Sequence, residues 1–146
     1  MSSVLDNFLT PELKSLLVDG DKLLNSNLET FNDYSFLVFN FSKAYEGFLK
    51  LLFLKMGIIR KQEYESDHWR VGKALSPHMH QVYDRIGPEF AERMWQTWKR
   101  GRNSIFHFYP HRLKILTLTE ARDLIAEILM TMEFSVSNYK ATDQLA

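Results

Sequence analysis

The sequence predicts an all-α protein, and three observations support this. Apolar residues recur at helical spacing over long stretches, and helix-start and helix-stop signals separate those stretches. No run longer than a few residues alternates as a strand does. The one β-like stretch, HRLKILTL at residues 111–118, is too short and isolated to build a sheet. We therefore expect a helical bundle.

The first helix is expected over residues 11–29. Thr10 can cap the free amides of its first turn, and Pro11 suits the first helical position. An apolar series follows at helical spacing and gives this helix a buried face: Leu13, Leu16, Leu17 and Leu24.

The second helix is expected to begin after residues 32–33 and to end near residue 56, where Gly57 can adopt the left-handed conformation of a helix end. Its buried stripe repeats at steps of four and three: Leu37, Phe41, Ala44, Phe48 and Leu51. Phe53 and Leu54 lie off this stripe, so the last turns are apolar nearly all round. This predicts burial on two sides, with a second subunit as one candidate partner.

Residues 58–75 form a mixed connector that allows no helix assignment. Ser76-Pro77 is expected to open a short helix to about Ile86, and Gly87-Pro88 a longer one through Phe106 that Pro110 stops. Four residues of the longer helix share one face: Phe90, Met94, Trp98 and Ile105.

The last helix starts at a capping box, Thr117 with Glu120 three residues later. Its buried stripe is Ala121, Leu124, Ile125, Ile128, Leu129 and Met132. A polar tail is expected after about Tyr139. The 146 residues are thus expected to form one domain, residues 1–146, with a core over about residues 10–138.

The composition limits the function classes. Cysteine is absent, which excludes disulfides, thiolate zinc sites and cysteine nucleophiles and is typical of a reducing compartment. We expect a cytoplasmic protein with no signal peptide or membrane span. No glycine-rich phosphate loop, nucleophile elbow or dinucleotide fingerprint is present, so no cofactor is expected.

Positive charge is concentrated between residues 95 and 115, although the formal net charge of the chain is zero. This window contains no Asp or Glu, and aromatic residues lie between its basic residues: Lys99, Arg100, Arg102, His107, His111, Arg112 and Lys114. Aromatic faces beside cations suit unpaired bases and phosphates. The alternative is that the aromatic residues are core and the cations form a solvated helix face.

The segment RNSIFHFY, residues 102–109, has a recognisable order of polar residues. Arg102 and Asn103 are followed after a short spacer by His107 and, two residues later, by Tyr109. This order resembles the signature of the HEPN superfamily. Three further pieces are similar to HEPN domains of the RNase LS type, namely AYEGFLKLL, WRVGKAL and LTEARDLIAEIL, so that the resemblance covers roughly residues 34–135.

The resemblance implies an up-and-down bundle of four to five main helices that forms a homodimer. It implies a metal-independent endoribonuclease of the toxin–antitoxin or phage-defence type, with Arg102 and His107 of both subunits in one cleft. The expected partners are an RNA substrate and a cognate antitoxin or a nucleotidyltransferase that modifies Tyr109. The alternative is a non-catalytic HEPN module that binds RNA, nucleotide or a partner protein. The residues expected to bind RNA are Lys99, Arg100, Arg112 and Tyr109.

The chemistry of the two central residues fits this activity. Cleaving RNA without a metal needs a group that moves a proton near neutral pH, which His107 can do. A guanidinium fork such as that of Arg102 stabilises charge on phosphoryl oxygens. Five residues of a regular helix turn the chain by about 500°, which would point these side chains apart. We expect the helix to end or distort between them, or a dimer axis to bring them together.

Three neighbouring residues have two interpretations each. Glu46 belongs to the active-site surroundings that the resemblance implies and could orient Arg102 or His107, or it could pair with Lys43 or Lys50 on its own helix. Asn103 could contact substrate or cap the helix end. His107 and His111 lie four residues apart, but no carboxylate is near and Pro110 interrupts the helix. No metal site is therefore expected.

Overall fold

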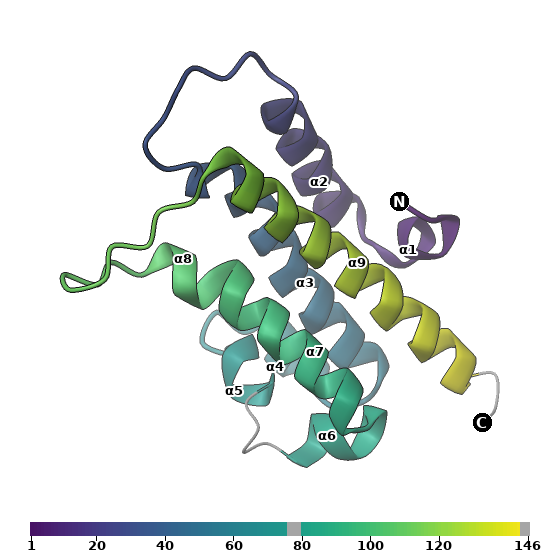
Figure 1. Ribbon diagram of the computed structural model, residues 1–146. Coiled ribbons are helices and arrows are strands. Elements are labelled where there is room, and N and C mark those ends of the chain that lie inside the picture. Colours follow the sequence, from purple (N-terminus) through teal and green to yellow (C-terminus); the bar gives the residue numbers. More distant parts are fainter. Residues whose placement is uncertain (76–79, 144–146) are drawn as a thin grey trace.

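All regular structure is helical in the computed structural model, which describes residues 1–75 and 80–143 (Figure 1). The α-helices are α1 (Ser3–Phe8), α2 (Pro11–Leu24), α3 (Phe39–Lys55), α4 (Lys61–Tyr64), α5 (Val71–Leu75), α6 (His80–Ile86), α7 (Pro88–Trp98), α8 (Ser104–Phe106) and α9 (Leu118–Asp143). A 3₁₀ turn, η1 (Ser35–Val38), precedes α3, and a π-helical turn, η2 (Lys99–Asn103), joins α7 to α8. The all-α class is confirmed.

Four longer helices, α2, α3, α7 and α9, form the bundle (Figure 1). Helix α3 packs against α2 and α9, and α7 packs against α9. Two expected helix starts are confirmed by their caps. Thr10 accepts a hydrogen bond from the Leu13 amide. Thr117 and Glu120 exchange the two hydrogen bonds of a capping box, at 2.8 and 3.1 Å.

Helix α3 is buried on most of its surface, and the chain itself supplies the cover. The whole expected stripe from Leu37 to Leu51 is buried, and so is Phe53, which has no exposed area. Of the two candidate covers for Phe53, its own chain is the one observed, because neighbouring helices already enclose it, whereas Leu54 beside it is partly buried.

Several boundaries differ from those expected. The short helix α1 was not predicted, and it places Leu5 and Phe8 in the core, ahead of residue 10. Helix α2 ends at Leu24 and not near residue 29. Helix α9 continues to Asp143, so the stretch expected to be a tail is largely helical. The Ser76-Pro77 helix start lies outside the described residues. None of the described helices is long and apolar enough to cross a membrane.

Candidate functional site

A π-helical turn replaces the regular helix where α7 meets the candidate segment. The turn spans Lys99–Asn103, and Gly101 at its centre is buried against α9. A Cβ at Gly101 would lie 3.1 Å from Cδ1 of Ile128, so a larger residue would push on α9. Ser42 of α3 donates a hydrogen bond to the Gly101 carbonyl. Wide turns of this kind occur frequently at functional sites.

Arg102, at the end of this turn, is held by two other residues. Its Nη1 lies 2.6 Å from Oε2 of Glu46 on α3. Its guanidinium carbon lies 5.2 Å from the centre of the Trp98 ring. Of the partners considered for Glu46, the ion-pair partner is Arg102, while Lys50 lies over Trp69. The structure thus brings together Arg102 and Glu46, two of the four residues expected at the catalytic site; the other two are Asn103 and His107.

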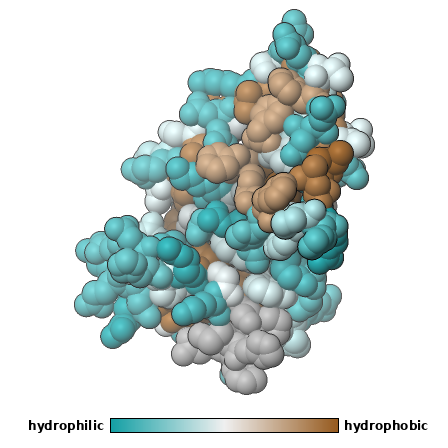
Figure 2. Space-filling model, turned by 90° about the vertical axis from the view of Figure 1, so that its left-hand side faces the viewer, coloured by the Kyte–Doolittle hydropathy of each residue, from teal (hydrophilic) through white to brown (hydrophobic). Residues whose placement is uncertain are grey.

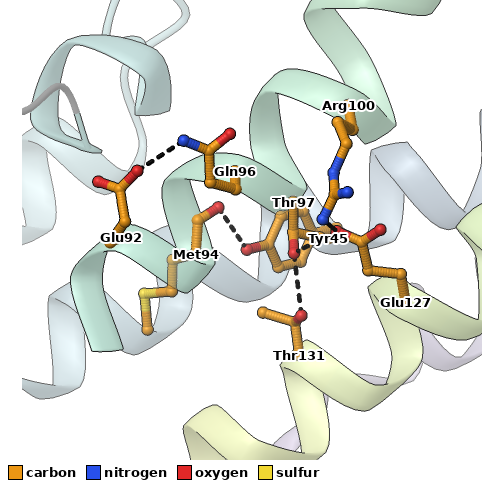
Figure 3. A network of polar contacts seen from close by, with 8 residues as sticks. All are labelled: Tyr45, Glu92, Met94, Gln96, Thr97, Arg100, Glu127 and Thr131. Carbon is orange, nitrogen blue, oxygen red and sulfur yellow. Dashed lines mark hydrogen bonds and ion pairs between the residues drawn. The ribbon is translucent and has the colours of Figure 1, made fainter. Parts of the chain in front are cut away.

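Arg100, two residues earlier, points to a different helix. Its Nη2 lies 2.6 Å from Oε1 of Glu127 on α9 (Figure 3). The Thr97 hydroxyl donates to the same carboxylate oxygen at 3.1 Å and lies 3.0 Å from the Thr131 hydroxyl. Because Thr97 has one proton to give, Thr131 must be the donor of that second bond. This network joins α7 to α9 and fixes the start of the π turn.

Behind this network, Tyr45 of α3 completes the link among three helices. Its hydroxyl donates to the Met94 carbonyl of α7 at 3.0 Å (Figure 3). Burial raises the pKa of Tyr45 well above its ordinary value, and the nearby Glu127 carboxylate adds to the shift. Tyr45 is therefore a neutral hydrogen-bond donor at any physiological pH and serves the packing of α7.

His107 lies beyond the end of the helix. Helix α8 ends at Phe106, and His107 has an extended backbone, with φ −103° and ψ 131°. The predicted helix end at Phe106 is confirmed, and Pro110 follows four residues later, where its ring would clash with the Phe106 carbonyl in a continued helix. The expected end or distortion between Arg102 and His107 is confirmed by the π turn and by this helix end. The spacing of a regular helix therefore does not separate these side chains.

Residues 107–115, named here the arm, project from the bundle (Figure 1). Every residue of the arm is exposed. It contains three expected site residues, His107, Tyr109 and Arg112, and the rings of His107 and Tyr109 lie 6.2 Å apart. The cations of the arm point to solvent, and those of the π turn lie against the bundle. The sequence window of positive charge is thus divided between two surroundings.

Both ends of the arm are fastened to residues 33–39. At one end the ring of Phe106 lies 5.8 Å from that of Phe39. At the other, the Leu116 amide donates to Asp33 Oδ1 at 3.0 Å, and the Leu116 carbonyl accepts from Tyr34 at 2.9 Å. Burial alone would raise the pKa of Asp33, but hydrogen bonds from Ser35 and Leu116 lower it below its ordinary value.

The remaining expected residues occupy intermediate places. Lys99 lies over the Trp95 ring, at 5.7 Å. Asn103 is partly buried at the end of the π turn and makes no capping hydrogen bond. Within the described part of the chain, no group of three or more acidic or histidine residues could hold a metal ion.

Sequence reasoning missed three residues of this site: Ser42, Trp98 in its role under Arg102, and Glu127. Each acts from a helix distant in sequence or through the π turn, so no local pattern marks it. The isolated glycine between two arginines, Gly101, was the available signal, since glycine inside a helix often marks a close approach. Comparisons of the chain with protein-family models, curated proteins and solved structures returned no match.

Proposed function

We propose that the chain is a metal-independent endoribonuclease of the HEPN type, acting as a toxin or in phage defence. The observation that carries the proposal is the placement of Arg102 and His107. Arg102 is held by Glu46 and Trp98 at a distorted helix end, and His107 follows on an exposed extended backbone. A fixed cation beside an exposed imidazole suits phosphodiester cleavage.

The proposed roles follow from these surroundings. Arg102 uses the guanidinium donors that Glu46 leaves free to stabilise charge on the phosphoryl oxygens. His107 moves the proton of the 2′-hydroxyl or of the leaving oxygen, which gives a 2′,3′-cyclic phosphate end. Asn103 contacts the same phosphate. Lys99, Arg100, Arg112 and Tyr109 attract and hold the RNA strand.

A homodimer completes the proposal, since two copies of the segment in one cleft double its positive charge. Because Phe53 is enclosed within its own chain, the dimer surface is expected on the face that carries the arm. The proposed partner protein is a cognate antitoxin or a nucleotidyltransferase, and the exposed Tyr109 is its expected target. Sedimentation at micromolar concentration measures the dimer directly, and a monomer would contradict a shared cleft.

Incubating the purified protein with single-stranded RNA in excess chelator tests the activity. Wild type is expected to cut and to leave cyclic phosphate ends. His107→Ala and Arg102→Ala should each lower the cleavage rate by about 10² or more, the range for a lost acid–base or charge-stabilising group. Equal cleavage by both variants would show that the site is assigned wrongly.

Two exposed residues outside the site supply matched controls. His68→Ala removes an imidazole and Arg122→Ala a guanidinium, and neither lies on the π turn or the arm. Both variants should keep the wild-type rate. Glu46→Gln distinguishes the positioning of Arg102 from the ion pair that neutralises it. Glutamine keeps a hydrogen-bond acceptor for Arg102 but removes the ion pair.

One observation favours the second candidate, a non-catalytic HEPN module. Glu46 neutralises Arg102 at 2.6 Å, which suits a positioned binding group as well as a catalytic one. This candidate is supported if pure dimer cuts no RNA under any condition but binds it in a salt-dependent manner that survives His107→Ala.

A further inference from the structure

The part of the arm from Arg112 to Ile115 belongs to no helix, bend or paired strand. No helix or turn includes residues 113–115, and their backbone groups make no hydrogen bond to another described residue. The neighbouring backbone groups on both sides are bonded, because Arg112 donates to the Tyr109 carbonyl and Leu116 to Asp33. The unpaired amides and carbonyls of residues 113–115 thus lie between two hydrogen-bonded residues, Arg112 and Leu116.

The side chains of this segment alternate in character. Leu113 and Ile115 are 69% and 50% exposed, and both are large and aliphatic. Arg112 and Lys114, the alternate residues, are exposed cations. Successive side chains of a β-strand point to opposite faces, so this segment would present one apolar and one positive face when paired as a strand. Exposed edges of this kind pair readily with another extended chain.

A group of aromatic side chains lies on the segment to which Leu116 is bonded. Tyr34, bonded to Leu116, stacks on Phe36, which in turn contacts Phe31. Figure 2 views the molecule from the side on which the arm projects, and apolar residues gather over the upper part of that face. Single exposed apolar side chains are ordinary, but a contiguous group of them marks an interaction site.

We propose that residues 112–115 bind an extended segment of another protein as an added β-strand. That segment carries acidic side chains opposite Arg112 and Lys114 and apolar ones opposite Leu113 and Ile115. Main-chain hydrogen bonds provide affinity in this mode of recognition, and the alternating side chains provide specificity. The binding does not depend on RNA cleavage, although an occupant would compete with RNA for Arg112.

A second copy of the same strand is a poor occupant. The cations stand at even positions and the apolar residues at odd ones. Antiparallel pairings of two copies that keep the apolar side chains on one face set even positions opposite even ones. In the two such registers with the most overlap of residues 112–115, Lys114 lies opposite Arg112 or Lys114 of the other copy. Like charges directly opposite each other destabilise a pair of strands.

RNA is also a poor occupant of this strand. Bases stack on aromatic rings, whereas Leu113 and Ile115 are aliphatic and need an apolar partner to leave water. The aromatic residues that suit RNA, Phe108 and Tyr109, lie on the other side of Pro110. The acidic and apolar segment satisfies both faces of the strand at once, which neither alternative does.

Two capped synthetic peptides test the proposal by amide NMR and hydrogen exchange on the full chain: one of alternating Glu and Val, seven residues long, and one of alternating Lys and Val. The Glu-Val peptide should bind and protect alternate amides among residues 113–115, since the Arg112 amide is already bonded to the Tyr109 carbonyl. The Lys-Val peptide should bind about tenfold more weakly, because two like-charge pairs replace two favourable ones.

Charge reversal on the strand provides the decisive variant. Arg112→Glu with Lys114→Glu should reverse the preference, so that the Lys-Val peptide binds more tightly. Lys22→Glu with Lys61→Glu changes the net charge equally at two exposed positions elsewhere and should keep the wild-type preference. Failure of the Glu-Val peptide to protect these amides overturns the proposal. Concentration-dependent protection without peptide, or protection by single-stranded RNA alone, would identify the other occupants and overturn it too.

Discussion

Arg102 and His107 stand five positions apart in one short segment, yet their surroundings differ sharply. Arg102 is fixed by Glu46 and Trp98 on a turn that packs against α3 and α9. His107 begins an arm in which every residue is exposed. The first half of the segment is therefore part of the bundle, and the second half is fastened to it only at its ends.

Within the eight residues 102–109, the first half therefore contributes to the stability of the bundle, and the second half is available for recognition. Changes in residues 102–105 alter packing of the bundle as well as any site chemistry. Changes in the arm alter what the protein can bind, with little effect on its free energy of unfolding, because exposed side chains are nearly as hydrated folded as unfolded. The same kind of substitution should consequently lower the free energy of unfolding much more in the first half than in the second.

The largest expected effect is that of Ile105→Ala. Ile105 is buried in the core at the end of the packed half, so truncation leaves a cavity and should lower the free energy of unfolding by about 3 kcal/mol. Urea unfolding followed by circular dichroism measures the loss. Ile115→Ala is the matched control on the arm and should cost less than about 0.5 kcal/mol. Similar losses in the two variants would refute the division.

A smaller loss is expected when the π turn is overpacked. Gly101→Val adds a side chain whose Cβ would lie only 3.1 Å from Cδ1 of Ile128, which should cost about 2 kcal/mol. Ile128→Val in the same chain makes room and should recover part of that cost, so the two effects should not add. Additive losses in this double-mutant cycle would mean that the contact with α9 does not determine why residue 101 is glycine.

The sequence predicted what local forces determine. The helix starts at Pro11 and after Thr117 follow from caps within three residues, and the buried stripes follow from helical spacing. The π turn could not be predicted from the sequence, because the hydrogen bond from Ser42 to the Gly101 carbonyl joins residues that are 59 positions apart. The helix end at Phe106, by contrast, was predicted from Pro110 four residues later, and the ring contact with Phe39 lies at that end. Pairing of Glu46 with Arg102 was one of two open alternatives, and only the fold decided between them.

The anchor of the arm should depend on pH. Asp33→Ala removes the acceptor of the Leu116 amide and should cost about 1 kcal/mol at pH 7, since the carboxylate is only partly buried. The pKa of Asp33 is lowered, so its contribution is complete above the ordinary value of 3.8 and is lost as pH falls through the lowered pKa. Wild type and variant should therefore converge in urea unfolding below pH 3.8. A difference that stays constant as the pH falls well below 3.8 would exclude the ionised carboxylate as the anchor.

The smallest expected effect on stability is that of Phe108→Ala. Phe108 is 76% exposed on the arm, so its truncation should change the free energy of unfolding by less than about 0.5 kcal/mol. Phe106→Ala is the matched control. It should cost more, because its ring contacts Phe39 where the arm leaves the bundle. If Phe108→Ala leaves unfolding unchanged but weakens binding of single-stranded RNA, this aromatic side chain serves recognition alone. A loss of stability as large as that of Phe106→Ala would place Phe108 in a packed contact and move the boundary between the two halves toward Pro110.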